Sequence, residues 1–230
     1  MSTLIEARGL SAGYGKMAVV RGVDLQVDEG EVVALIGANG AGKTTTLLTL
    51  AGELSPLDGE VRFFGEPTRS PMHARCRRGL SYVTEERSVI MDMSVADNLK
   101  LAAVPPATAF EYFPILEAIM DRRAGLCSGG EQQMLSLARA LGRQPKLLLA
   151  DELSLGLAPL VVTSLLQAVR DAADERGVGV LLVEQHVRQA LKIADRVHVM
   201  ERGRIVVSGT PDEVVGQLDR IEAAYLTGEP

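Results

Sequence analysis

The sequence predicts an α/β fold with a mostly parallel sheet between helices and a smaller antiparallel β unit. Three apolar runs support the parallel sheet, at residues 32–36, 147–150 and 178–183. A strand that is apolar on both faces is typical of a parallel sheet covered by helices. The antiparallel unit is predicted from residues 23–27, where apolar and polar side chains alternate before a turn at residues 28–30.

Composition favours a globular chain without a membrane span. The 230 residues include 24 Lys and Arg against 30 Asp and Glu, a net charge of −6, which argues against nucleic acid as the main partner. No apolar stretch reaches the length of a membrane span, and the first residues lack the layout of a signal peptide. Cys76 and Cys127 show no metal-ligand spacing and fit a reducing compartment. We therefore expect a cytoplasmic chain, which could still dock onto a membrane protein.

In the first half of the chain, turn and capping residues separate short elements. Ser94 can cap a helix whose third helical position is Asp97. A basic run with Arg75, Arg77 and Arg78 suits the end of a short helix, and we expect it to form a solvated face. Strands are predicted at residues 4–7, 23–27, 32–36, 58–65 and 80–83, and helices at residues 45–51, 70–79 and from Ser94 to before Pro105.

In the second half, two capping boxes mark helix starts. Ser128 with Glu131, and Thr210 with Glu213, have the spacing in which each side chain bonds the other residue's backbone N–H. Residues 105–125 mix proline, alanine and apolar residues without a clear period. Helices are predicted at residues 129–141, 160–176 and from Pro211, and strands at residues 147–151, 178–183, 197–200 and 205–207.

The most informative stretch is the loop between residues 32–36 and the helix that follows. Residues 37–44 match the phosphate-loop pattern G-x-x-x-x-G-K-[ST] at every fixed position, between a strand and a helix as the motif requires. In such a loop backbone N–H groups and the positive end of the helix face phosphate oxygens. Lys43 would reach the β- and γ-phosphates, and the Thr44 hydroxyl would ligate Mg²⁺.

Two acidic residues and one tyrosine are further candidates for the site. Asp151 and Glu152 follow a buried strand, and strand ends of this kind form the ligand crevice of an open α/β sheet. One acid can hold Mg²⁺ while its neighbour orients or deprotonates a water molecule. Tyr14 lies between two glycines, where it could stack on an adenine ring or be an exposed loop tyrosine.

These motifs together resemble the ATPase subunits of ABC transporters. Residues 37–44, 127–133 and 147–152 look like the Walker A, signature and Walker B motifs of that family. The resemblance covers essentially the whole chain. Residues 154–160 and 183–186 look in particular like the branched-chain amino-acid importers, and among these like the smaller of the two ATPase subunits.

The resemblance implies a fold and a division of the chain. The expected fold is a P-loop NTPase core with a mostly parallel sheet, an antiparallel β subdomain and a small helical subdomain. Residues 1–230 would form one ABC ATPase domain, with residues 1–87 and 144–230 as the nucleotide-binding core and β subdomain. Residues 88–143 would form the helical subdomain, which contacts the membrane subunits in this family.

The resemblance also implies roles for individual residues, with ATP and Mg²⁺ as the cofactors. Glu152 would polarise the hydrolytic water, and Mg²⁺ would be held by Thr44, Glu85 and Asp151. Ser128, Gly129 and Gly130 would meet the γ-phosphate of a nucleotide bound by a partner ATPase subunit. The remaining nucleotide contacts would come from Tyr14, Gly37, Ala38, Asn39, Gly40, Ala41, Gly42, Lys43, Thr44 and Thr45.

The chain departs from the family pattern at four places. Cys127 stands where leucine is usual, and Leu153 replaces the usual proline, which could loosen the loop that carries Glu152. Glu85 occupies a position that is glutamine in most members. Counting back ten residues from Asp195 gives Gln185 as the γ-phosphate switch residue, with His186 one step further as the alternative.

The leading hypothesis is thus an ATP-hydrolysing subunit of an importer. Its expected partners are a second ATPase subunit, permease subunits and, indirectly, a solute-binding protein, which would place it at the inner face of the cell membrane. A soluble ABC-type ATPase in translation or DNA repair is a second hypothesis, although such proteins usually have two cassettes or coiled-coil insertions. A small-molecule kinase is a third, but it would not need residues 128–133.

Overall fold

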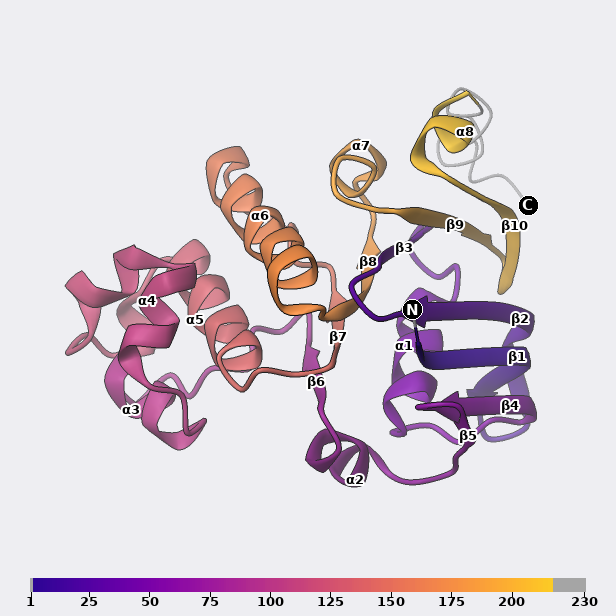
Figure 1. Ribbon diagram of the computed structural model, residues 1–230, viewed down its shortest axis with the longest axis horizontal. Helices are drawn as coiled ribbons and strands as arrows, with labels where there is room; N and C mark the ends of the chain where they lie inside the picture. The colour runs from indigo at the N-terminus through magenta and orange to yellow at the C-terminus, as the bar shows by residue number, and fades with distance from the viewer. Residues whose placement is uncertain (1, 217–230) are drawn as a thin grey trace.

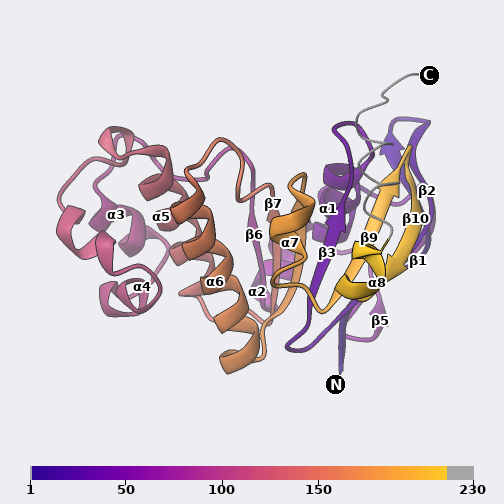
Figure 2. The same cartoon turned by 90° about the horizontal axis from the view of Figure 1, so that it is seen from above.

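Two sheets and two groups of helices make up the computed structural model, which describes residues 2–216 (Figures 1 and 2). Residues 1 and 217–230 of the predicted domain lie outside the described part of the chain. The larger sheet has the order β10-β9-β3-β8-β7-β6 and the smaller one β2-β1-β4-β5. The strands are β1 (Thr3–Tyr14), β2 (Met17–Asp28), β3 (Val32–Ile36), β4 (Asp58–Phe63), β5 (Glu66–Pro67), β6 (Leu80–Val83), β7 (Leu147–Asp151), β8 (Gly179–Glu184), β9 (Arg196–Glu201) and β10 (Arg204–Gly209).

The larger sheet is mostly parallel, as the apolar runs predicted. Each neighbouring pair from β9 to β6 is parallel, and only β10 pairs antiparallel, with β9. Every residue of β3, β7 and β8 is buried. Helices α6 (Pro159–Arg176), α1 (Lys43–Ala51) and α7 (Val187–Ala190) pack around these strands. Parallel strands end at the same edge of a sheet, so the loops after β3, β7 and β8 lie together.

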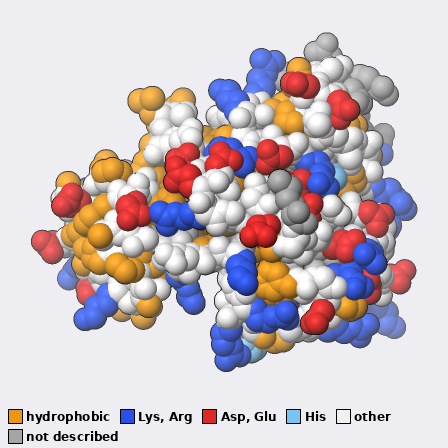
Figure 3. Space-filling model, in the orientation of Figure 1, with side chains coloured by type: hydrophobic (Ala, Val, Ile, Leu, Met, Phe, Trp, Pro, Cys, Tyr) orange, Lys and Arg blue, Asp and Glu red, His pale blue; other side chains and the backbone are white. Residues whose placement is uncertain are grey.

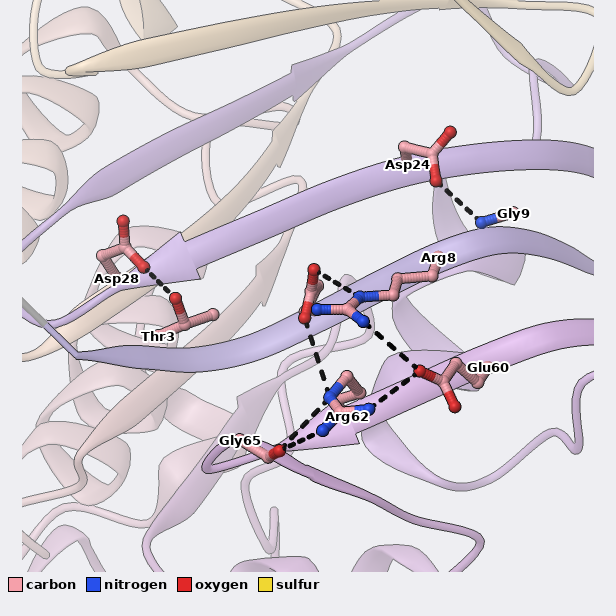
Figure 4. A network of polar contacts seen from close by, with 9 residues as sticks. Thr3, Arg8, Gly9, Asp24, Asp28, Glu60, Arg62 and Gly65 are labelled. Carbon is pink, nitrogen blue, oxygen red and sulfur yellow. Dashed lines mark hydrogen bonds and ion pairs between the residues drawn. The ribbon is translucent and has the colours of Figure 1, made fainter.

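The smaller sheet is antiparallel, and its first two strands, β1 and β2, are longer than the sequence pattern indicated. Irregularities in the β1–β2 register interrupt the alternation, so only residues 4–7 and 23–27 were predicted as strand. Its polar face carries an ion-pair network that joins β1 and β4 (Figure 4). Arg62 and Arg8 pair within their own strands, with Glu60 at 3.0 Å and Glu6 at 2.7 Å, and each lies 3.9 Å from the glutamate of the other strand. Cross-strand pairs of opposite charge stabilise neighbouring strands modestly.

A second group of helices lies between β6 and β7 in the chain. Its core includes Leu99, Phe113, Leu116 and Leu135, all fully buried or nearly so. Ser94 caps α3 as predicted, by accepting a hydrogen bond from the Asp97 N–H. The group comprises α3 (Val95–Leu101), α4 (Pro106–Tyr112), the 3₁₀ segments η1 (Pro114–Ile119) and η2 (Ala124–Leu126), and α5 (Gly129–Leu141). Residues 105–125 contain one α-helix of only 7 residues, α4, followed by 3₁₀ turns, which have no 3.6-residue period, so the segment showed no clear period.

The basic run near α2 (Met72–Arg77) requires a correction. Arg75 was expected on a solvated face, but only 1% of it is exposed. Its guanidinium donates hydrogen bonds to the carbonyls of Thr49, Leu50 and Ser70, and so fixes the C-terminal end of α1. The neighbouring Arg77 and Arg78 are exposed as expected.

The surface is unevenly apolar. Figure 3 shows hydrophobic side chains gathered at the left, over the region of α3, α4 and α5. The exposed large hydrophobic residues in this part include Met91, Leu101, Ile115 and Leu126. Among residues 2–216, no helix has both the length and the apolar character needed to cross a membrane.

Candidate nucleotide-binding site

The phosphate loop joins β3 to α1 by a tight path that depends on its glycines. A Cβ on Gly37 would lie 2.5 Å from the Met200 carbonyl oxygen, so no other residue fits without a shift of the backbone. Gly40 and Gly42 have φ angles of 80° and 106°, which favour glycine. The loop is further held by the Ala41 carbonyl, which accepts a hydrogen bond from the Gly203 N–H.

Helix α1 begins at this loop without any side-chain cap. Its N-cap residue is Gly42, and its first turn contains no acidic residue. The first N–H groups of a helix have no partner within the helix, and its N-terminus carries a partial positive charge. The start of α1 therefore suits an anion such as phosphate.

Lys43 brings the phosphate loop and the end of β7 together. Its ammonium donates to the carbonyls of Gly37 and Ala38 at 2.8 and 3.2 Å. The same nitrogen lies 3.4 Å from Oε1 of Glu152, and only 4% and 10% of the two side chains are exposed. Two candidates that are 109 positions apart in the sequence thus form a buried ion pair.

Asp151 has the surroundings expected of a divalent-cation ligand. Its side chain is 2% exposed and is hydrogen-bonded to the Thr44 hydroxyl, while Oδ1 has no hydrogen-bond partner. Burial raises the pKa of Asp151 to about 6, a rise that the Thr44 hydrogen bond opposes and that the charges of Glu152 and Glu85 increase. Glu85 is exposed on the loop after β6.

The donor set fits Mg²⁺ rather than a protein-enclosed metal. Among residues 2–216, no three His, Cys, Asp or Glu side chains converge on a metal-sized site. Mg²⁺ prefers oxygen ligands, keeps several waters and is usually held by one or two protein groups together with phosphates. A free, buried carboxylate oxygen beside a threonine hydroxyl at a phosphate loop meets that requirement.

The loop after β7 is anchored on both sides of Glu152. The Glu152 N–H donates to the Val183 carbonyl at 2.9 Å, and Leu153 is 1% exposed within the core. Ser154 donates from its N–H and its hydroxyl to the two carboxylate oxygens of Glu184, at 3.1 and 2.6 Å. In the described structure Leu153 packs into the core where a proline was expected, and the loop is held by these hydrogen bonds; whether the loop is looser than one with proline stays a prediction.

Glu184 was not identified from the sequence as a residue of this site. It ends the apolar run of β8 and is 1% exposed. Burial raises the pKa of Glu184 to about 7, against the hydrogen bonds from Ser154. The sequence did contain a signal for Glu184: an acidic residue at the end of an apolar strand, which is the pattern that identified Asp151 as a candidate.

The two candidates for the switch residue follow Glu184. Gln185 is half-buried, and its backbone N–H is hydrogen-bonded to the Glu184 carboxylate. His186 is exposed and precedes α7 as its N-cap residue. Both lie on the loop after β8, next to the loop after β7, so the geometry leaves both alternatives open.

The predicted capping box at the start of α5 is present. Ser128 Oγ accepts from the Glu131 N–H at 3.2 Å, and the Glu131 carboxylate accepts from the Ser128 N–H at 2.6 Å. A Cβ on Gly130 would lie 3.0 Å from Val161 of α6. Cys127 is buried, and its thiol donates to the Arg123 carbonyl. Both views place α5 and α1 on opposite sides of β6 and β7 (Figures 1 and 2).

Tyr14 lies at the turn between β1 and β2, where 53% of it is exposed. The strand that follows this turn passes the phosphate loop, since a Cβ on Gly42 would lie 3.1 Å from Val20 of β2. An exposed ring near the loop suits stacking on a base and equally suits a solvated turn.

Comparison with known proteins gives a consistent result. Residues 20–154 match the family model described as ABC transporter. The chain is 41% identical to the high-affinity branched-chain amino acid transport ATP-binding protein BraG of Pseudomonas aeruginosa, over 95% of this chain and 97% of BraG. It is 38% identical to the lipopolysaccharide export system ATP-binding protein LptB of Acidithiobacillus ferridurans, over 94% and 93% of the two chains. It is 34% identical to a probable branched-chain amino acid transport ATP-binding protein LivF of Archaeoglobus fulgidus, over 90% and 92%.

The fold agrees with solved structures. The ATP-binding subunit of an ABC transporter superposes with a TM-score of 0.81 and 28% identity, covering 97% of this chain and 99% of the other. The P-loop NTPase fold expected from the sequence, with its added antiparallel sheet and helices, is therefore confirmed.

Proposed function

This chain belongs to the ABC transporter family of ATP-binding subunits, which hydrolyse ATP, and from that premise we propose that it energises an importer of branched-chain or related amino acids. The proposal that the chain hydrolyses ATP at this site is supported by the ion pair between Lys43 Nζ and Glu152 Oε1, which lie 3.4 Å apart. A phosphate-loop cation and a strand-end carboxylate from distant motifs face each other in a buried place. The proposal about the solute is supported by BraG and LivF, whose names both specify branched-chain amino acids.

The phosphate loop binds the nucleotide in this proposal. The N-terminus of α1 and the backbone from Gly37 to Thr45 face the phosphates, and Lys43 exchanges its loop carbonyl contacts for the β- and γ-phosphate oxygens. Tyr14 stacks on the adenine from the β1–β2 turn.

Thr44, Asp151 and Glu85 would hold Mg²⁺, with Glu85 contributed by the loop after β6. Mg²⁺ held there would supply positive charge against the charge that develops on the phosphates during hydrolysis. Asp151 is suited to this role because its free Oδ1 is already desolvated and its carboxylate is oriented by Thr44.

Glu152 accepts a hydrogen bond from the attacking water and takes up its proton, while Gln185 or His186 contacts the γ-phosphate. Loss of a positioned general base costs about 10²–10⁴-fold in rate. Single-turnover hydrolysis with saturating Mg·ATP tests this assignment. Glu152→Gln should bind ATP normally and hydrolyse it slowly, and a wild-type rate in that variant would exclude Glu152 as the base.

Two ATPase chains cooperate in this proposal. Helix α5 lies across β6 and β7 from α1 (Figures 1 and 2), and Ser128 at its start is exposed, so Ser128, Gly129 and Gly130 would contact a nucleotide held by a second chain. The dimer can be a homodimer or a heterodimer. For the isolated chain, activity should rise more than linearly with protein concentration or depend on a second ATPase subunit. Full turnover of a dilute monomer would contradict the shared site.

An exporter is the second candidate, because the exporter subunit LptB is 38% identical over nearly the whole chain. Either assignment places the chain against permease subunits at the inner face of the membrane, and an importer would add a solute-binding protein. The discriminating experiment is to isolate the intact complex in a mild detergent, identify its permeases and reconstitute it in liposomes. Leucine supplied with the cognate binding protein should stimulate ATP hydrolysis; stimulation by a lipopolysaccharide substrate would favour the exporter.

A further inference from the structure

Glu184 is a buried acid that the proposed mechanism does not use. It stands at the C-terminal end of β8, is 1% exposed and has no cationic partner among the described residues. A carboxylate in such a place is unfavourable unless hydrogen bonds satisfy it. Glu184 accepts three: from the N–H and the hydroxyl of Ser154 and from the backbone N–H of Gln185.

These hydrogen bonds join two loops that leave neighbouring strands. β7 and β8 run in parallel, with Asp151 opposite Val183. Ser154 follows Glu152 by two positions in the loop after β7, and Gln185 begins the loop after β8. The Glu184 side chain therefore fixes the distance between the two loops at the edge of the sheet where the phosphate loop also lies.

Glu152 has a backbone conformation that needs such support. Its φ of 47° is in the left-handed region, which is unfavourable for a residue with a side chain. On its N-terminal side the conformation is held by the hydrogen bond from its own N–H to Val183. On its C-terminal side the buried Leu153 and the two Ser154–Glu184 hydrogen bonds hold it.

Resting on the proposed function, we infer that Glu184 is a positioning residue: it holds the loop after β7 through Ser154, so that the Glu152 carboxylate faces the phosphate loop. The usual proline would stiffen this loop through its fixed φ angle. Here the support comes from a hydrogen-bonded carboxylate and a packed leucine. The inference concerns the direction of a catalytic side chain, and Glu184 itself touches no substrate.

Three variants separate this role from a merely structural one. Glu184→Ala removes all three hydrogen bonds, and Ser154→Ala removes the one from the hydroxyl. Glu184→Gln preserves the geometry, because the amide oxygen can accept from the Ser154 N–H while the amide nitrogen donates to the Ser154 hydroxyl. Glu201→Ala is the matched control, since Glu201 ends β9, the next strand along the chain, but is exposed.

The experiment measures the single-turnover rate at saturating Mg·ATP and, separately, ATP affinity, on the full chain at one high protein concentration. Glu184→Ala should hydrolyse about 10–100-fold more slowly, the loss expected when a catalytic group is misplaced by about 1 Å. Ser154→Ala should lose less, Glu184→Gln should recover most of the rate, and Glu201→Ala should match wild type. ATP affinity should be unchanged in all four.

A double variant tests whether Glu184 acts through Glu152. In the Glu152→Gln background, Glu184→Ala should cause no further loss of rate. An equal further loss, a parallel fall in ATP affinity, or a wild-type rate in Glu184→Ala and Ser154→Ala would overturn the inference. If Glu184→Ala does not fold, the Ser154→Ala and Glu184→Gln rates decide alone. A wild-type rate in Glu152→Gln itself would instead refute the proposed catalytic role of Glu152.

Discussion

The starts of α1 and α5 are both glycine-rich, yet they are built in opposite ways. Helix α1 begins at Gly42 with no side-chain cap and no acid in its first turn. Helix α5 begins at Ser128 with a complete capping box and Glu131 in its first turn. The first helix start is left open to an anion and receives a buried cation, Lys43. The second is satisfied within its own chain and offers a hydroxyl.

This difference shows that a glycine-rich helix start can be built either to bind a phosphate group with its own free N–H groups or to present a capping side chain to a second chain. An open helix start has unpartnered N–H groups and is stable only because the surrounding loop is fixed, here by glycines with φ angles near 80° and 106°. A capped start is satisfied within its own chain, because the Ser128 hydroxyl accepts from the Glu131 N–H and is hydrogen-bonded to the Glu131 carboxylate, while Ser128 itself stays exposed to a second chain. In the proposed function, α1 binds the chain's own nucleotide and α5 completes the site of a partner.

The largest effect is expected from removing the cation at the open start. Lys43→Ala should weaken ATP binding by about 100-fold, since hydrogen bonds to charged groups contribute up to about 3 kcal/mol. It also leaves Glu152 without its cationic neighbour in a buried place. Isothermal titration calorimetry measures the affinity, with the exposed Lys192→Ala as control. Equal affinities for Lys43→Ala and wild type would refute the phosphate-loop assignment.

The capped start should respond differently. Ser128→Ala should leave ATP affinity unchanged and lower hydrolysis by about tenfold at concentrations that favour dimers, for loss of one hydrogen bond to a charged phosphate. The lost cap should also lower the free energy of unfolding by about 1 kcal/mol. Calorimetry measures the ATP affinity, a steady-state assay measures the hydrolysis rate, and urea unfolding measures the change in stability. A fall in affinity like that of Lys43→Ala would show that Ser128 serves its own nucleotide.

Alanine at corresponding glycines sharpens the contrast. Gly42→Ala forces a left-handed conformation on a residue with a side chain and should cost about 1–2 kcal/mol of folding stability. Gly129 has no positive φ angle, and the neighbour its Cβ would meet is the guanidinium of Arg87, which can move aside. Gly129→Ala should therefore cost less than about 0.5 kcal/mol. Equal losses in urea unfolding would mean that backbone conformation is not what distinguishes the two starts.

The smallest effect concerns the acid found only at α5. Hydrogen bonds from the Ser128 backbone N–H and from its hydroxyl lower the pKa of Glu131, so its ionised form stabilises the folded state. That contribution is present above its ordinary pKa of 4.5 and is lost as the pH falls through the lowered value. Glu131→Gln should cost about 0.3–1 kcal/mol at pH 7 and nothing at a pH below both values. If Glu131→Gln lowers the free energy of unfolding equally at acidic pH, the effect comes from the shape of the side chain and not from its charge.

Patterns within a few residues of each other could be recognised from the sequence. The phosphate loop, both capping boxes, the apolar strands and the helix over residues 160–176 depend on neighbours at fixed spacing, and the structure contains each of them. The β1 and β2 strands were recognised only in part, because bulges interrupt the alternation of side chains. Arg75 was misassigned because its partners, the carbonyls at the end of α1, are 25 and 26 positions away.

The sequence by itself determined the two helix starts, the parallel strands and the order of the candidate residues along the chain, because helix caps, loops and apolar runs are local. Only the tertiary structure decided which of those residues meet. Parallel strands distant in sequence end at one edge of the sheet, so Lys43 reaches Glu152, Thr44 reaches Asp151 and Glu184 reaches Ser154. Strand order sets those contacts, and strand order depends on how the buried faces pack together, which no short stretch of sequence encodes.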